Sequence, residues 1–148
     1  MTLATQLLIA VLLLCACSSP RKQAASPGDD WTVFEWPEVV VEASPFREAE
    51  HGRVAIDGVR ARPLEEAEIA SLRVVFFDDG DGDGRPSPPE RLVDLTTTPW
   101  AESHTIEQGK FELRRVPRLM VEVTVELTSG RTRSAVWTLR SERSPEIR

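Results

Sequence analysis

The stretch LMVEVTVEL, residues 119–127, decides the fold, because polar and apolar side chains alternate along it. From Leu119 onward every second side chain is Leu or Val, whereas Glu122, Thr124 and Glu126 lie on the other side. Successive side chains of a β-strand lie on opposite faces of the sheet, so this period of two indicates a strand with one buried face. We therefore expect the Leu and Val side chains to enter a core.

A turn and a returning strand follow this segment. Ser129 and Gly130 are residue types that favour a turn. Beyond them, Ala135, Trp137 and Leu139 recur at every second position and continue the apolar face. The two segments together predict an antiparallel β-hairpin near the end of the chain.

Further segments earlier in the chain have the β-branched or alternating composition of strands. They are residues 39–43, 53–59, 72–77 and 91–98. Asp57-Gly58 indicates a weak turn or bulge within the second of them. The composition of residues 63–72 favours a helix that begins at Pro63, whereas the family resemblance described below implies an extended segment, and both interpretations stay open. Many short strands and little helix predict an all-β fold, an antiparallel Ig-like β-sandwich.

The beginning of the chain has the composition of a secretory leader. Residues 1–16 contain no charged side chain, and their apolar run is too short to span a bilayer as a helix. Leu14-Cys15-Ala16-Cys17 resembles the cleavage box of bacterial lipoproteins. The resemblance implies cleavage after Ala16, acylation of Cys17 and attachment to a lipid membrane at the cell envelope, at an outer membrane facing the periplasm or the cell surface. An ordinary secretory signal or a short anchor is the alternative.

The remaining chain divides by composition. Residues 17–30 comprise the cysteine that the resemblance implies is lipidated and a small, polar segment that predicts a disordered tether. Residues 31–140 predict the β-sandwich domain, and residues 141–148 a frayed tail. Trp31 and Trp36 stand at the start of the domain. They either pack the chain onto the core or form an exposed aromatic patch for a partner.

An acidic segment, DDGDGDGRPSPPE at residues 78–90, interrupts the strand pattern. Counted from Asp79, it has aspartate at positions 1, 3 and 5, glycine at 6 and glutamate at 12, the spacing of a twelve-residue calcium loop. The candidate Ca²⁺ ligands are Asp79, Asp81 and Asp83, the Arg85 carbonyl, Ser87 through a water, and Glu90. The loop itself resembles that of an EF-hand.

The flanks of this segment differ from those of an EF-hand. Residues 74–77 are β-branched or aromatic and predict a strand, and Pro88 and Pro89 oppose a helix that starts inside the loop. We therefore expect a calcium loop between two strands. A solvated acidic turn is the alternative. Repulsion among five carboxylates, with only Arg85 and Arg91 near them in sequence, favours a bound cation.

Motifs spread over residues 52–139 resemble the carboxypeptidase regulatory-like domain family. They are Gly52-Arg53-Val54, Arg62-Pro63-Leu64, Ala67-Glu68-Ile69, Thr97-Thr98, Gly109-Lys110-Phe111-Glu112-Leu113 and Val116-Pro117. The resemblance implies a transthyretin-like sandwich of about seven strands without catalytic residues. The sequence departs from the family in its acidic insertion, which is closer to the calcium loops of some collagen-adhesin B-type repeats, and at Arg118, which replaces the usual glycine.

The sequence offers few candidate catalytic residues. The histidines, His51 and His104, lie far apart in sequence, and no thiol remains if Cys15 is removed and Cys17 is acylated. The net charge of -6 without a basic stripe argues against a nucleic-acid partner. We therefore expect a non-enzymatic structural or interaction module with a possible envelope protein partner. The alternatives are a docking subunit of secretion or motility machinery and a small-ligand-binding lipoprotein.

An arginine patch is a candidate docking surface for such a partner. It would consist of Arg114, Arg115, Arg118, Arg131 and Arg133. A solvated rim of the sandwich is the alternative.

Overall fold

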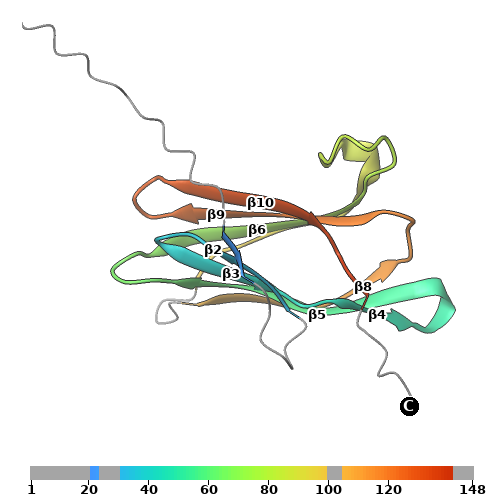
Figure 1. The fold of residues 1–148 in the computed structure, drawn as a ribbon, viewed down its shortest axis with the longest axis horizontal. Helices are drawn as coiled ribbons and strands as arrows, with labels where there is room; N and C mark the ends of the chain where they lie inside the picture. Colours follow the sequence, from blue (N-terminus) through green and yellow to red (C-terminus); the bar gives the residue numbers. More distant parts are fainter. Residues whose placement is uncertain (1–20, 24–30, 100–104, 142–148) are drawn as a thin grey trace, which may run out of the picture.

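The computed structural model describes residues 21–23, 31–99 and 105–141, and over these ranges the chain forms strands joined by turns (Figure 1). The strands are β1 (Arg21–Gln23), β2 (Thr32–Glu35), β3 (Val39–Ala43), β4 (Phe46–Ala49), β5 (Arg53–Pro63), β6 (Ile69–Asp78), β7 (Arg91–Thr97), β8 (Ile106–Arg114), β9 (Leu119–Leu127) and β10 (Thr132–Thr138). Two short 3-10 turns are η1 (Glu50–Gly52) and η2 (Pro88–Glu90). The predicted all-β fold is confirmed, with β1, β2 and β4 adding short strands to the expected seven.

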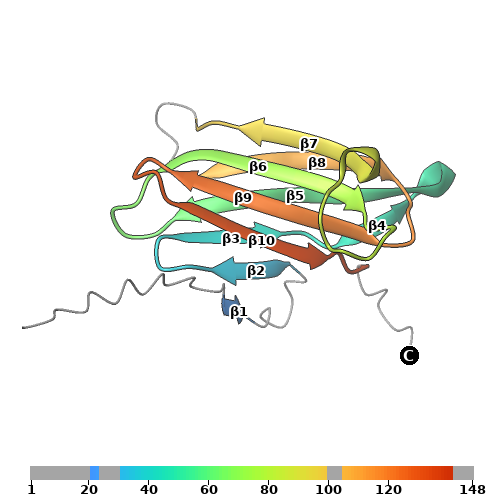
Figure 2. The same ribbon diagram turned by 90° about the horizontal axis from the view of Figure 1, so that it is seen from above.

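The strands form two antiparallel sheets stacked face to face, as Figures 1 and 2 show. In the first sheet, β1, β2, β3 and β5 are neighbours in that order, and β5 also pairs with β4 and β8. The second sheet has the order β10-β9-β6-β7. The long strand β5 is therefore central to the first sheet, and β6 and β9 are the central strands of the second.

The predicted hairpin is the β9–β10 pair. Val123 lies opposite Ala135 and Val121 opposite Trp137, so the two apolar faces are in register. Val121, Val123 and Val125 are completely buried between the sheets. Burying each such side chain stabilises the fold by roughly 1.5–3 kcal/mol, which explains why the alternation predicts this strand so well.

The aromatic residues at the start of the domain are part of the core. Phe34 on β2 and Trp36 are 6% and 3% exposed. The ring of Phe34 lies 4.5 Å from that of Trp137 on β10, so β2 packs against the second sheet. Trp31 is partly exposed, and the guanidinium carbon of Arg60 lies 4.5 Å from its ring centroid. Trp36 therefore packs the chain onto the core and is no surface anchor for a partner.

The expected turn at Asp57-Gly58 is wrong, because β5 runs straight through it with Gly58 opposite Gly109 on β8. Glycine is needed there for another reason: a Cβ atom on Gly58 would lie 2.9 Å from the Gln108 carbonyl oxygen. Residues 64–68 form a turn and short connection, and β6 begins at Ile69, so the extended interpretation of residues 63–72 holds.

As expected, the acidic loop lies between two strands, β6 and β7, and the described residues show no α-helix in it, only the three-residue 3-10 turn η2. η2 places Pro88 and Pro89 at its first positions, where a backbone N–H has no partner within the helix and proline is accepted. Ser87 caps this turn and Glu90 reaches back to it.

Several sequence-based predictions concern residues that the structure does not describe. The signal peptide at 1–16, Cys17, most of the tether at 17–30 and nearly all of the tail at 141–148 lie outside the described residues. Within the predicted tether, residues 21–23 form β1, which pairs with β2. Over the described ranges, no helix has the length and apolar character needed to cross a membrane.

Candidate metal site

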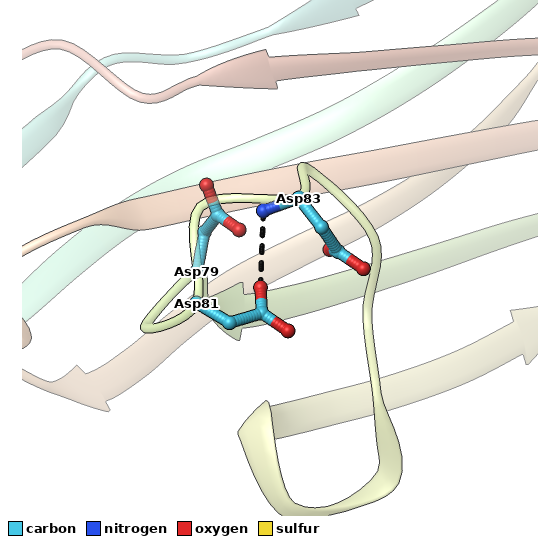
Figure 3. Close-up of side chains that lie close together, drawn as sticks. All are labelled: Asp79, Asp81 and Asp83. Atoms are coloured by element: carbon cyan, nitrogen blue, oxygen red, sulfur yellow. Dashed lines mark hydrogen bonds between the residues drawn. The ribbon is translucent and has the colours of Figure 1, made fainter.

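The acidic loop connects β6 to β7 at one end of the second sheet, where Figure 1 shows it standing away from the strands. It brings Asp79, Asp81 and Asp83 together, with one carboxylate oxygen of each within 4.8 Å of the others (Figure 3). Asp79 is buried at the base of the loop, and the other two are exposed. Three carboxylates this close can hold a metal ion.

Backbone amides of the loop orient these carboxylates. Asp79 Oδ1 accepts a hydrogen bond from the N–H of Gly84 at 2.9 Å. Asp81 Oδ1 accepts one from the N–H of Asp83 at 3.0 Å, drawn in Figure 3, and Asp83 Oδ1 accepts one from the N–H of Arg85 at 2.7 Å. These bonds curl the loop inward. The curl requires the left-handed backbone of Gly84, with φ of 70°, at the predicted sixth position.

Glu90 closes the loop from its other end. Its Oε1 accepts hydrogen bonds from the N–H groups of Gly80 and Asp81, at 3.1 and 3.4 Å. Its Oε2 accepts from the Ser87 hydroxyl and the Ser87 N–H. The Ser87 hydroxyl is the main reason that the pKa of Glu90 lies below its ordinary value, and the backbone donors add to the effect.

The other predicted ligands, Glu90, the Arg85 carbonyl and Ser87, all make hydrogen bonds within the loop, and the Glu90 carboxylate is not part of the aspartate cluster. Glu90 accepts from the Gly80 and Asp81 amides, and the Arg85 carbonyl accepts the N–H of Ser87 at 3.0 Å. The Ser87 hydroxyl, predicted to hold a water on the ion, donates to Glu90. The structure thus assembles the ligands at positions 1, 3 and 5 and uses position 12 to fasten the loop.

A cation from a distant part of the chain reaches the site. Arg118, in the connection between β8 and β9, places Nη2 3.2 Å from Asp79 Oδ2. Its carbonyl oxygen also accepts the N–H of Asp79 at 3.1 Å. The Asp79 side chain is only 2% exposed, and a buried carboxylate without a positive partner is costly. Only Arg85 and Arg91 lie near the loop in sequence, and Arg118, a departure from the family pattern, reaches it through the fold.

Four of the five arginines of the candidate patch form ion pairs. Arg131 and Arg133 both bind Glu38, and Arg115 binds Glu48. Arg118 binds Asp79, so its charge is engaged at the acidic loop. These four arginines pair with three carboxylates, Glu38, Glu48 and Asp79, so their charges are divided among separate ion pairs.

The chemistry of the trio is that of a hard cation site. Carboxylate oxygens suit Ca²⁺, Mg²⁺ and Mn²⁺, whereas imidazole and thiolate ligands favour zinc, copper and iron. The trio offers oxygen alone. The structure confirms the prediction that this loop has the residues to hold a metal ion.

Comparisons with known proteins give few matches. No protein-family model and no curated protein sequence matches the chain. Among solved structures, a superoxide reductase (neelaredoxin) from Ignicoccus hospitalis is similar at 15% identity and a TM-score of 0.42, over 71% of this chain and 80% of that one. A variant of the same reductase is similar at 14% identity and a TM-score of 0.40, over 77% and 81% of the two chains.

These neighbours contradict the sequence-based prediction of a non-enzymatic structural or interaction module and its docking and ligand-binding alternatives. The proteins they name are enzymes, so that prediction is not retained. At this identity and TM-score the likeness assigns no activity to this chain. The aspartate trio, by contrast, is a group of side chains in this chain that could hold a metal ion.

Proposed function

We propose that this chain is a calcium-binding β-sandwich protein whose ion site is the loop from Asp79 to Glu90. The observation that carries the proposal is the convergence of Asp79, Asp81 and Asp83 at alternate positions, with glycine at the sixth position. This is the arrangement in which a short loop supplies several hard oxygen ligands to one Ca²⁺ ion.

Calcium fits this loop better than magnesium. Ca²⁺ accepts six to eight oxygen ligands in a flexible arrangement, whereas Mg²⁺ requires near-octahedral geometry and keeps several waters. Asp81 and Asp83 are exposed and can adjust to the larger ion, and backbone carbonyls of the loop can complete its shell. Extracellular calcium modules bind with dissociation constants of about 10⁻⁴ to 10⁻³ M, so we expect an affinity in that range.

The ion would stabilise the end of the second sheet. The loop joins β6 to β7, and its start is bonded to Arg118 just before β9. Neutralising the aspartates removes their mutual repulsion and fixes the loop between these strands. Since only the folded loop holds the ligands together, Ca²⁺ should stabilise the folded protein by mass action.

We also propose that Cys17 is acylated and anchors the chain to a membrane of the cell envelope. The support is the lipoprotein-like box Leu14-Cys15-Ala16-Cys17 at the end of an apolar leader. Mass spectrometry of the chain purified from bacterial membranes should find acyl chains on Cys17. A Cys17→Ser variant should leave the membrane fraction, and its retention there would contradict the anchor.

Thermal unfolding tests the calcium proposal. At about 5 mM Ca²⁺ and a dissociation constant of about 10⁻⁴ to 10⁻³ M, mass action stabilises the fold by about 1–2 kcal/mol and raises Tm by about 5 °C. The same concentration of Mg²⁺ should give a clearly smaller shift. Equal shifts with both ions would point to general screening of the acidic loop, and no shift with either would contradict the proposal.

A further inference from the structure

We propose that Arg118 is a built-in competitor of the metal ion: its guanidinium binds the Asp79 oxygen that Ca²⁺ needs, and it must leave that oxygen when the ion binds. The inference rests on the proposed calcium site and concerns its regulation. Arg118 comes from outside the acidic loop, and its carbonyl oxygen accepts the N–H of Asp79 at 3.1 Å.

The competition is for a single atom. Asp79 Oδ1 is engaged by the N–H of Gly84, a bond that belongs to the curl of the loop. The other oxygen, Oδ2, lies 3.2 Å from Arg118 Nη2, and we take it as the oxygen that a cation at the first position would bind. A positive group is therefore already placed on the buried carboxylate at the base of the site.

The loop backbone makes room for this guanidinium. A Cβ atom on Gly82 would lie 2.9 Å from Arg118 Nη1, which means that the side chain packs closely on the loop between its first and fifth positions. Glycine at this position keeps that space open. The guanidinium therefore lies beside the aspartate oxygens and raises the positive potential where a metal ion would enter.

Exchange requires only a side-chain movement. Arg118 is 57% exposed, so its side chain can swing into solvent without leaving a buried cavity. Its carbonyl oxygen keeps the bond from the N–H of Asp79, so the loop stays attached to the start of β9. Arg118 thus satisfies a buried carboxylate without metal and lowers the affinity for metal at the same time.

Calorimetric titration of the full chain with CaCl₂ tests the competition. Repulsion between a divalent ion and a guanidinium about 6 Å apart in a mostly aqueous setting corresponds to roughly a tenfold change in affinity at most. Arg118→Gln should therefore bind Ca²⁺ about threefold to tenfold more tightly. Arg115→Gln is the control, since it removes the same charge from an exposed pair with Glu48 away from the loop, and its affinity should stay within about twofold of the original.

The outcomes separate the two proposals. If the unaltered chain binds no Ca²⁺, the proposed function fails. If it binds and Arg118→Gln binds equally or more weakly, only the competition is overturned. Nuclear magnetic resonance of the unaltered chain tests the inference without a variant, which could misfold. The Arg118 Nε–H resonance should shift as Ca²⁺ is added, with the same saturation curve as the calorimetric signal. An unchanged resonance at saturation would overturn the inference.

Discussion

Arg133 on β10 donates two hydrogen bonds to Glu38, from Nη2 to Oε1 at 2.7 Å and from Nε to Oε2 at 3.1 Å. Glu38 directly precedes β3 in the first sheet, so this bidentate pair joins the first sheet to β10, the edge strand of the second. Both side chains are largely buried, and Arg131 adds a third bond to Glu38 at 3.0 Å. The two arginines, with the Arg133 hydrogen bond first, lower the pKa of Glu38 to about 2.

Replacing Glu38 with Gln should lower the free energy of unfolding by about 1–2 kcal/mol, because it removes a charge-assisted, bidentate contact between the sheets. Chemical denaturation measures the loss. Glu48→Gln, which affects an exposed pair with Arg115, should cost less than about 0.5 kcal/mol. Equal losses in the two variants would show that the contact between the sheets has no special role.

The same pair predicts a pH dependence. A carboxyl group whose pKa is lowered by folding stabilises the folded state above its unfolded pKa of 4.5, and that contribution is lost as the pH falls from 4.5 towards about 2. The difference in stability between the unaltered chain and Glu38→Gln should therefore be largest near neutral pH and shrink below pH 4.5. A difference that stays constant over this range would contradict the assignment.

Gly58 and Gly109 lie opposite each other on β5 and β8 but should respond differently to alanine. A Cβ on Gly58 would meet the Gln108 carbonyl oxygen at 2.9 Å, whereas one on Gly109 has no neighbour within 4 Å among the described residues. Gly58→Ala should lower stability by about 1–3 kcal/mol through backbone displacement. Gly109→Ala should be neutral or slightly stabilising, and equal effects in thermal unfolding would argue against the close approach.

Trp36 should behave as a core residue. Truncation to alanine removes a side chain that is 3% exposed and should lower stability by about 3–5 kcal/mol. Trp31→Ala removes a partly exposed ring and should cost clearly less. Urea denaturation of both variants measures the difference. A negligible loss at Trp36 would mean that its burial does not contribute to the fold.

Glu90 should control the opening of the acidic loop. Glu90→Ala removes the acceptor of the Gly80 and Asp81 amides, so their hydrogen exchange should become faster, while amides in the centre of β9 keep their rates. Ser87→Ala removes only the hydroxyl donor and should give a smaller change. Because the pKa of Glu90 is lowered, the protection should be present near neutral pH and decline as the pH falls below the ordinary glutamate value.

Local patterns predict much of the fold. The alternation at 119–127 specifies β9 because one of its faces is buried and the other is polar. The run Val74–Phe77 has no such alternation, and the structure shows why: Phe76 enters the core between the sheets, while Val75 and Phe77, on the other side of β6, are also buried. The β-branched and aromatic composition therefore predicts this strand but does not tell which of its faces belongs to the core.

Part of the candidate site can be predicted from the sequence, and part cannot. The aspartate trio lies within five consecutive residues, 79–83, so its spacing can be read directly from the sequence. The pairing of Asp79 with Arg118 depends on the β6–β9 register, which places Asp78 opposite Leu119. Likewise, the need for glycine at position 58 arises from a neighbouring strand. Contacts set by strand pairing are what a single sequence does not reveal.

The most direct test of the calcium site is a calorimetric titration of the full chain with CaCl₂, beside the double variant Asp81→Asn/Asp83→Asn and an Asp57→Asn control. Asp57 is exposed and pairs with Arg47 outside the loop, so its variant separates the site from a general loss of negative charge. We predict saturable binding with a dissociation constant of about 10⁻⁴ to 10⁻³ M, retained in the control and lost in the double variant. No heat of binding at several times that concentration, or equal binding by all three proteins, would contradict the calcium site.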